Sequence, residues 1–218
     1  MASREEVQLA VRAGADAVGF VGPMPSSSHS IDDRTIAELA ALVPPPIATF
    51  LLTSEVTAAG IARHVERTHA STVQIVSQIA ASEAAELARL LPATRRVHVV
   101  HVENEGVFEL IERYAPYVHA YLLDSGRPNL AVPELGGTGR THDWRISAEF
   151  VRRSPLPVFL AGGLSPANVR EAIRRVRPFG VDLCSGVRTE GRLDATKLDA
   201  FIEAVRQADL DGQGNAPE

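Results

Sequence analysis

Two apolar runs near the C-terminus each end in small residues, Gly162 and Gly163 in the first and Ser185 and Gly186 in the second. Glycine lets a backbone approach a ligand closely and leaves its N–H groups available. After the first run, Ser165-Pro166 suits a helix start, where anions bind well. Two such loops at βα spacing predict a phosphate site, as in the loops after strands 7 and 8 of (β/α)₈ barrels. The alternative is that these glycines only form tight turns.

Composition fits one α/β domain in the 218-residue chain, expected over residues 1–210, with a disordered tail over 211–218. The formal net charge is −5 and the basic residues are scattered, which argues against a nucleic-acid partner. No apolar run is long enough to span a membrane, so no membrane partner is expected. Cys184 is the single cysteine, so no internal disulfide can form and a cytoplasmic location is expected.

Hydrophobic runs and turn residues recur about every 25 residues, the period of a βα unit. Strands are expected at 17–21, 47–52, 72–76, 97–102, 120–123, 158–161 and 181–185. Helices are expected near 3–13, 32–42, 55–67, 82–91, 105–114, 144–152, 166–175 and 194–206. This pattern predicts an α/β (β/α)₈ TIM barrel with strand 1 missing, which should have two open edges. The alternative is a fold that departs from a barrel.

Four segments resemble the phosphoribosylanthranilate isomerase family of tryptophan biosynthesis. They are Ala13–Val21, Tyr121–Ser125, Gly136–Gly139 with Asp143-Trp144, and Leu160–Leu164 with the run through Val187. The pairing of Leu-Leu-Asp-Ser with Gly-Gly-Thr-Gly is the specific part. The Gly-Gly and Ser-Gly loops also occur in many other phosphate-binding barrels.

The resemblance implies an Amadori rearrangement of a phosphoribosylated amine, with no cofactor and no metal, because the substrate nitrogen is the electron sink. It makes Asp124 the general acid that opens the ribose ring. Asp124 ends an apolar strand, and partial burial there would raise its pKa. Asp182 is a catalytic helper or a structural carboxylate. Gly137 belongs to a loop expected to close over the substrate.

Substrate-binding positions depart in part from the family pattern. His29 stands where the family has an arginine that pairs with the anthranilate carboxylate, and histidine lacks the bidentate fork. Gln74 is retained in Val-Gln-Ile-Val-Ser, but Val76 replaces the family's histidine. Another phosphorylated sugar amine is therefore an alternative substrate.

The family's general base, a cysteine in a Lys-x-Cys-Gly stretch on strand 1, has no counterpart in this sequence. One explanation is a start codon assigned at an internal Met, with the base encoded upstream. Another is a catalytically inactive paralogue that binds a phosphorylated ligand. Cys184 is expected to face inward on the last strand, where it is a core residue or a substitute base. Metal-ligand spacing is absent, and the sequence leaves the oligomeric state open.

Overall fold

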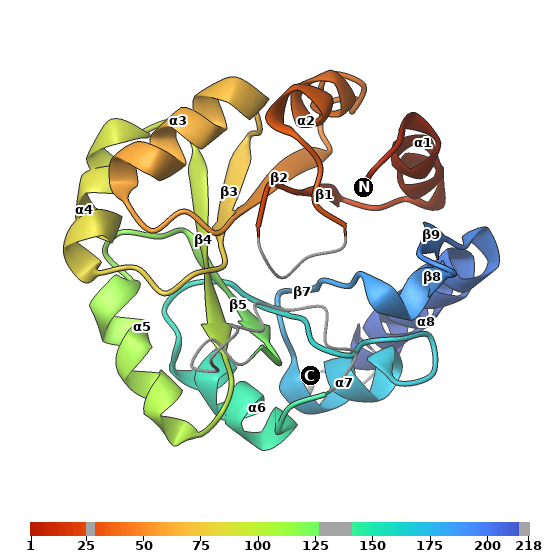
Figure 1. Ribbon diagram of the computed structural model, residues 1–218. Coiled ribbons are helices and arrows are strands. Elements are labelled where there is room, and N and C mark those ends of the chain that lie inside the picture. The colour runs from red at the N-terminus through yellow and green to blue at the C-terminus, as the bar shows by residue number, and fades with distance from the viewer. Residues whose placement is uncertain (25–28, 127–140, 214–218) are drawn as a thin grey trace.

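The computed structural model describes residues 1–24, 29–126 and 141–213. One curled sheet of seven parallel strands runs in chain order from β1 to β7, with helices around its outside (Figure 1). The strands are β1 Ala17–Val21, β2 Ala48–Thr53, β3 Thr72–Ile75, β4 Arg95–His101, β5 Ala120–Asp124, β6 Val158–Leu160 and β7 Gly180–Val181. The helices are α1 Arg4–Ala13, α2 Asp33–Ala40, α3 Ala58–Thr68, α4 Ala81–Leu90, α5 Glu109–Tyr114, α6 Trp144–Arg153, α7 Val169–Val176 and α8 Ala195–Gln213. The expected α/β barrel lacking one strand is confirmed.

Local signals define the helix ends. The Ser3 side chain accepts a hydrogen bond from the backbone N–H of Glu6, and Gly14 ends α1 in the left-handed region at φ 93°. Asp32 caps α2 by accepting the N–H of Thr35. Each signal is a short-range match between a side chain and an unpaired backbone group, so it could be predicted from sequence.

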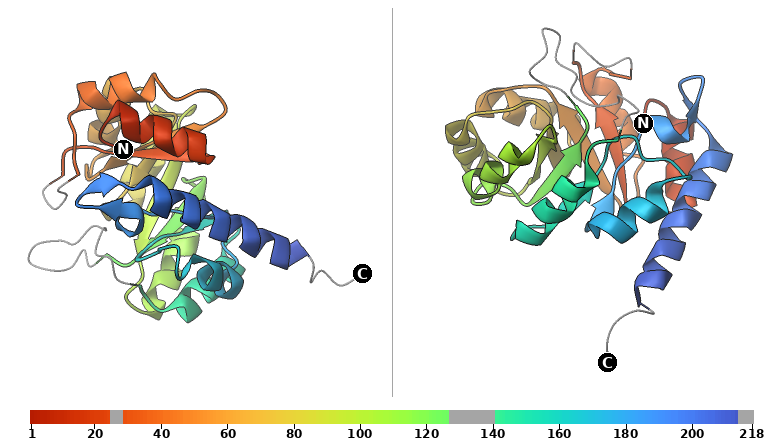
Figure 2. Two further views of the ribbon diagram at one scale, coloured as in Figure 1. Left: turned by 90° about the vertical axis from the view of Figure 1, so that its right-hand side faces the viewer. Right: turned by 90° about the horizontal axis from the view of Figure 1, so that it is seen from below.

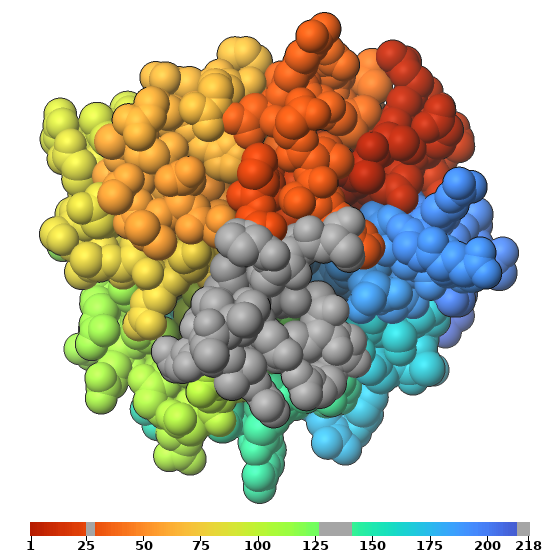
Figure 3. Space-filling model, in the orientation of Figure 1, coloured from red at the N-terminus to blue at the C-terminus, as the bar shows by residue number. Residues whose placement is uncertain are grey.

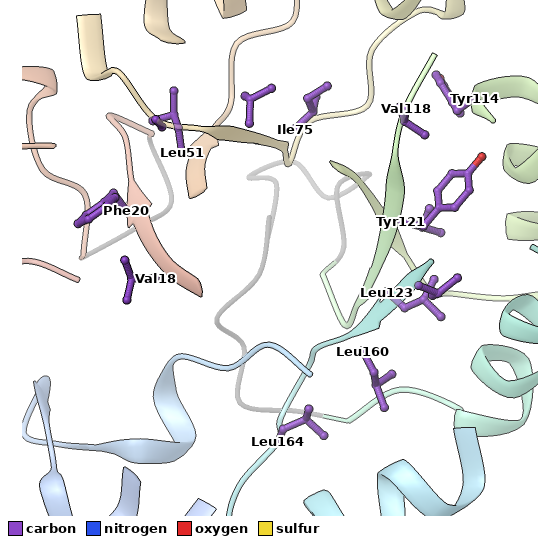
Figure 4. Packing of buried hydrophobic residues seen from close by; sticks show 14 of the residues in the cluster. Val18, Phe20, Leu51, Ile75, Tyr114, Val118, Tyr121, Leu123, Leu160 and Leu164 are labelled. Atoms are coloured by element: carbon purple, nitrogen blue, oxygen red, sulfur yellow. The ribbon is translucent and has the colours of Figure 1, made fainter. Parts of the chain in front are cut away.

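Side chains alternate between two apolar layers along each strand. The outer layer packs between strands and helices and includes Phe20, Leu51, Tyr121 and Leu123, which point away from the centre of the ring (Figure 4). The inner layer fills the barrel. It consists of Val76, Val97, Val99, Ala120, Leu122 and Ala161. A residue's parity along its strand therefore decides whether it faces a helix or the barrel interior.

The ring is open between β1 and β7, which do not pair with each other. Helix α1 lies against α8 on this side, so the first and last helices are neighbours (Figures 1 and 3). Glu6 of α1 forms a bidentate ion pair with Arg188, at 2.6 and 3.0 Å, and also accepts the N–H of Leu193. The Glu6 and Arg188 side chains are only 13% and 8% exposed. This ion pair therefore joins the two ends of the chain across the opening.

Replacing Glu6 by Gln is expected to lower the free energy of unfolding at pH 7 by about 2 kcal/mol, because Arg188 loses its buried counter-ion. Burial opposes ionisation of Glu6, but the bonds from Arg188 and from backbone N–H groups outweigh it and lower the pKa to about 2. A lowered carboxyl pKa stabilises the fold at pH above the unfolded value, and the stabilisation is lost as pH falls from about 4.5 toward 2.

Urea unfolding at pH 7 and pH 3 measures this effect, with exposed Glu66→Gln on α3 as the control. The difference between wild type and Glu6→Gln should shrink at pH 3. An equal difference at both pH values would contradict the assigned ion pair.

The C-terminal quarter differs from the sequence-based expectation. Strand β7 has two residues instead of five, and a 3₁₀ helix at Ser185–Val187 and a hairpin of β8 (Arg188–Thr189) with β9 (Arg192–Leu193) follow it. Helix α8 continues through Gln213 and projects beyond the ring (Figure 2), so residues 211–213 of the expected tail are helical. An ion pair between Arg170 and Asp211 at 2.6 Å holds that extension against α7. No described helix is both long and apolar enough to cross a membrane.

Candidate active site

Asp124 is the last residue of β5 and has the parity of inner-layer Ala120 and Leu122, so its side chain points into the carboxyl end of the barrel. Its carboxylate accepts the backbone N–H of Ser125 at 2.7 Å. Burial raises the pKa of Asp124, against the opposing effects of the Ser125 bonds and the charge of His101. A half-buried carboxyl with a raised pKa retains its proton closer to neutral pH, as a general acid requires.

Asp182 follows β7 and donates its backbone N–H to the carbonyl of Leu160 at 2.9 Å. Burial, followed by the nearby charge of Asp124, raises the pKa of Asp182 to about 6. The charge of Asp124 thus reaches Asp182, although β6 separates their strands. The structure places the two acids singled out in the sequence in one electrostatic unit.

The two glycine-containing loops touch. A Cβ on Gly186 would lie 1.9 Å from the carbonyl oxygen of Leu164, so no other residue fits there without moving the backbone. Gly162 and Gly163 both have positive φ, at 84° and 65°. A Cβ on Gly162 would come within 3.0 Å of the Ser125 nitrogen, so this loop also borders Asp124. The glycines therefore permit close contact between loops, in addition to tight turns.

Several backbone donors in these loops remain available. Among the described residues, no protein atom accepts the N–H groups of Gly162, Gly163, Ser185 and Gly186. Asn168 bridges the first loop, because its amide accepts the N–H of Ser165 at 2.8 Å and donates to the carbonyl of Gly163 at 2.9 Å. Such a cluster of unpaired N–H groups can bind an anion.

The expected helix start at Ser165-Pro166 was wrong in detail. Helix α7 begins at Val169 after a turn over 166–168, and Asn168 is its N-cap. The side chain of Asn168, rather than that of Ser165, bonds the exposed backbone groups. The amide of Asn168 has its donor and its acceptor on separate atoms, so it bonds the Gly163 carbonyl and the Ser165 N–H at the same time.

Cys184 was expected to face inward, and this was wrong because β7 ends at Val181. Beyond it the chain leaves extended geometry, with Cys184 at φ −133° and ψ −70°, and the cysteine is exposed. Strand alternation therefore no longer applies at residue 184. The exposed position of Cys184 gives no support to a role as substitute for the general base of the family.

The remaining substrate-binding predictions lie around the ring. Gln74 on β3 is buried and shares the inward parity of Val76. His29 is half-buried, and burial, followed by the charge of Arg188, lowers its pKa, so it carries little charge at neutral pH. Gly137 falls outside the described residues.

His101 is a neighbour of this site that is not among the candidate residues named from the sequence. It ends β4 directly opposite Asp124 in the parallel register, with the inward parity of Val97 and Val99. His98 faces the other way and stacks on Tyr114 at 4.0 Å. Parity alone could have separated the two histidines, but only the register shows that His101 borders the acid.

A polar cluster outside the barrel interior resembles a hydrolase triad. Thr53 Oγ1 lies 2.8 Å from His64 Nδ1, and His64 Nε2 lies 3.0 Å from Asp33. Thr53 is fully buried and has the outward parity of Leu51, so no substrate can reach it. These contacts tie β2 to α2 and α3 and have a structural role.

Comparison with known proteins identifies relatives along almost the whole chain. The model of the family described as N-(5'phosphoribosyl)anthranilate (PRA) isomerase matches residues 1–204. The N-(5'-phosphoribosyl)anthranilate isomerase of Methanosarcina acetivorans is 34% identical over 217 residues, covering 94% of this chain and 90% of its own. That of Haloarcula marismortui is 34% identical over 206 residues, covering 94% and 92%.

Solved structures agree with the sequence comparison. The phosphoribosyl anthranilate isomerase of Thermococcus kodakaraensis has a TM-score of 0.78 and 33% identity, covering 94% of this chain and 95% of its own. The enzyme of Thermotoga maritima has a TM-score of 0.81 and 28% identity, covering 95% and 96%. A further isomerase structure, with a TM-score of 0.78 and 26% identity, covers 95% of each chain and holds reduced 1-(o-carboxyphenylamino)-1-deoxyribulose 5-phosphate.

Proposed function

Because the chain belongs to the N-(5'-phosphoribosyl)anthranilate isomerase family, we propose that it converts N-(5-phosphoribosyl)anthranilate into the carboxyphenylamino-deoxyribulose phosphate, a step of tryptophan biosynthesis. The reaction is an Amadori rearrangement, in which an aminoaldose becomes an aminoketose. An acid protonates the ring oxygen, the ring opens to an iminium, and a base removes the proton on C2. The family assignment favours this substrate over another phosphorylated sugar amine.

The placement of Asp124 at the mouth of the barrel is the observation that carries the proposal. Its inward direction, its position at the carboxyl end of β5 and its raised pKa suit a group that gives a proton to the ribose oxygen. Protonation turns that oxygen into a good leaving group. Asp182 sits close enough that the charge of Asp124 adds to burial in raising the pKa of Asp182 to about 6.

We assign the substrate phosphate to the two touching glycine-containing loops. Their unpaired N–H groups, the φ angles of Gly162 and Gly163, and the N-terminus of α7 next to them together suit a phosphate. The phosphate would lie beside Ser125 and therefore near Asp124. Gly162 belongs to the proposed phosphate loop, and it borders Ser125, the residue that follows the acid. His29 and Gln74 remain proposed contacts of the substrate's other end.

The proposed reaction also needs a general base. The family's Lys-x-Cys-Gly motif has no counterpart in residues 1–218, and Cys184 is exposed. That a segment encoded upstream supplies the base stays a prediction. A second candidate function, binding of the phosphorylated ligand without turnover, is favoured by this same missing base. A cytoplasmic location likewise stays a prediction.

Binding and turnover are tested separately. Calorimetry with reduced carboxyphenylamino-deoxyribulose 5-phosphate should give a micromolar Kd for residues 1–218, and failure to bind at 1 mM, roughly −4 kcal/mol, would overturn the proposed site. Turnover is followed as loss of phosphoribosylanthranilate fluorescence, for residues 1–218 and for the chain extended by its in-frame upstream codons. If the ligand binds but neither residues 1–218 nor the extended chain turns over phosphoribosylanthranilate, the second candidate function is favoured. Growth of a tryptophan auxotroph then tests the substrate.

A further inference from the structure

A row of four residues, three of them polar, crosses four neighbouring strands at one level of the barrel. His101 of β4 pairs with Asp124 of β5 in the parallel register. The pairs Leu123–Leu160 and Leu160–Val181 place Ala161 and Asp182 next in the row, one residue further along each strand. Inward parity holds along the row, because Ala161 belongs to the inner layer. Ala161, which lies between the two acids in this row, has only a methyl side chain.

The hydrogen bonds of His101 fix its tautomer. Its Nε2 lies 3.0 Å from the carbonyl oxygen of Val76. A carbonyl only accepts hydrogen bonds, so Nε2 carries the proton. The other ring nitrogen, Nδ1, is buried and has no hydrogen-bond partner in the described part of the chain. His101 therefore has an uncommitted basic nitrogen in the barrel interior, beside the proposed acid.

Asp124 and His101 also face other titratable groups. Asp182 approaches Asp124 from the end of β7, and the Met1 ammonium group partly opposes the rise that burial causes in the pKa of Asp182. His142 also lies beside Gly162, where a Cβ would be 3.0 Å from its Nδ1, and burial lowers the pKa of His142 to about 4. The charge of His101 opposes the effect of burial on Asp124. Of these groups, only His101 is both the register neighbour of Asp124 and a base.

We infer that His101 is a positioning residue for Asp124: the Val76 carbonyl holds Nε2, Nδ1 stays uncommitted, and a proton taken up from water at Nδ1 stabilises the carboxylate that Asp124 becomes when it acts as the acid. When Asp124 gives its proton to the ribose oxygen, the negative charge left behind then faces a positive one. The catalytic part of this inference rests on the proposed isomerase activity. The pairing itself is a property of the resting protein.

Carbon-13 NMR titration of the Asp124 carboxyl group tests the pairing without turnover. His101→Gln keeps an N–H for the Val76 carbonyl but removes the titrating nitrogen, so the acid dissociation constant of Asp124 should fall about threefold to tenfold. His98→Asn, on the opposite face of the same strand, is the control and should leave Asp124 unchanged.

An Asp124 titration that is the same in wild type and His101→Gln, or equally shifted by His98→Asn, would overturn the pairing. In an active enzyme, His101→Gln should move the alkaline limb of the kcat–pH profile upward with KM within about twofold, whereas a merely structural role would leave the limb in place. If neither residues 1–218 nor the chain extended upstream turns over phosphoribosylanthranilate, the proposed function fails but the NMR result stands. The two failures are therefore distinguishable.

Discussion

Replacing Asp124 by Asn is expected to lower kcat about 10³-fold in the protein that turns over, with little change in KM. The amide keeps the shape of the carboxyl group but cannot donate a proton to the ribose oxygen. The melting temperature should stay the same or rise. Burial raises the pKa of Asp124, so at neutral pH its ionised form destabilises the folded state, and removing that charge relieves the cost.

Steady-state kinetics and thermal unfolding at pH 7 check this prediction together. Asp209→Asn, an exposed carboxylate on α8, is the matched control and should change neither value. The pKa of Asp182 should also fall below about 6 in Asp124→Asn, because the neighbouring negative charge is gone. Full activity of Asp124→Asn would refute its role as the acid.

Replacing Gly186 by Ala should damage both the fold and the ligand site. A Cβ at this position would lie 1.9 Å from the carbonyl oxygen of Leu164, and the obstacle is backbone that no rotamer change can remove. Forcing the two loops apart should lower the free energy of unfolding by about 3 kcal/mol. The same displacement separates the N–H groups proposed to hold phosphate, so the Kd for ribose 5-phosphate should rise at least about tenfold.

Urea unfolding and calorimetric titration with ribose 5-phosphate measure the two effects of Gly186→Ala. Gly212→Ala is the control, because a Cβ there meets nothing within 4 Å. It should leave both stability and affinity close to wild type. Unchanged phosphate affinity in Gly186→Ala would argue that the anion binds elsewhere.

Much of the architecture could be predicted because its signals are local. Apolar runs such as Ala17–Val21 and caps such as Ser3 depend on residues a few positions apart. Asp124 was located for the same reason, since it directly ends an apolar strand. The glycine loops were visible too, because Gly162 and Gly163 follow such a run. Hydrophobic periodicity and turn residues depend on neighbours within one helix, strand or turn. The sequence alone therefore determined the order of the βα units.

The tertiary structure decided whatever depends on neighbouring strands. The length of β7 depends on pairing with adjacent strands, so its end at Val181, and with it the exposure of Cys184, could not be predicted from an apolar run. The position of His101 beside Asp124 is a matter of register between β4 and β5. Register and edge pairing join residues that are distant in the chain, and strand alternation says which face a side chain takes but not which partner it meets.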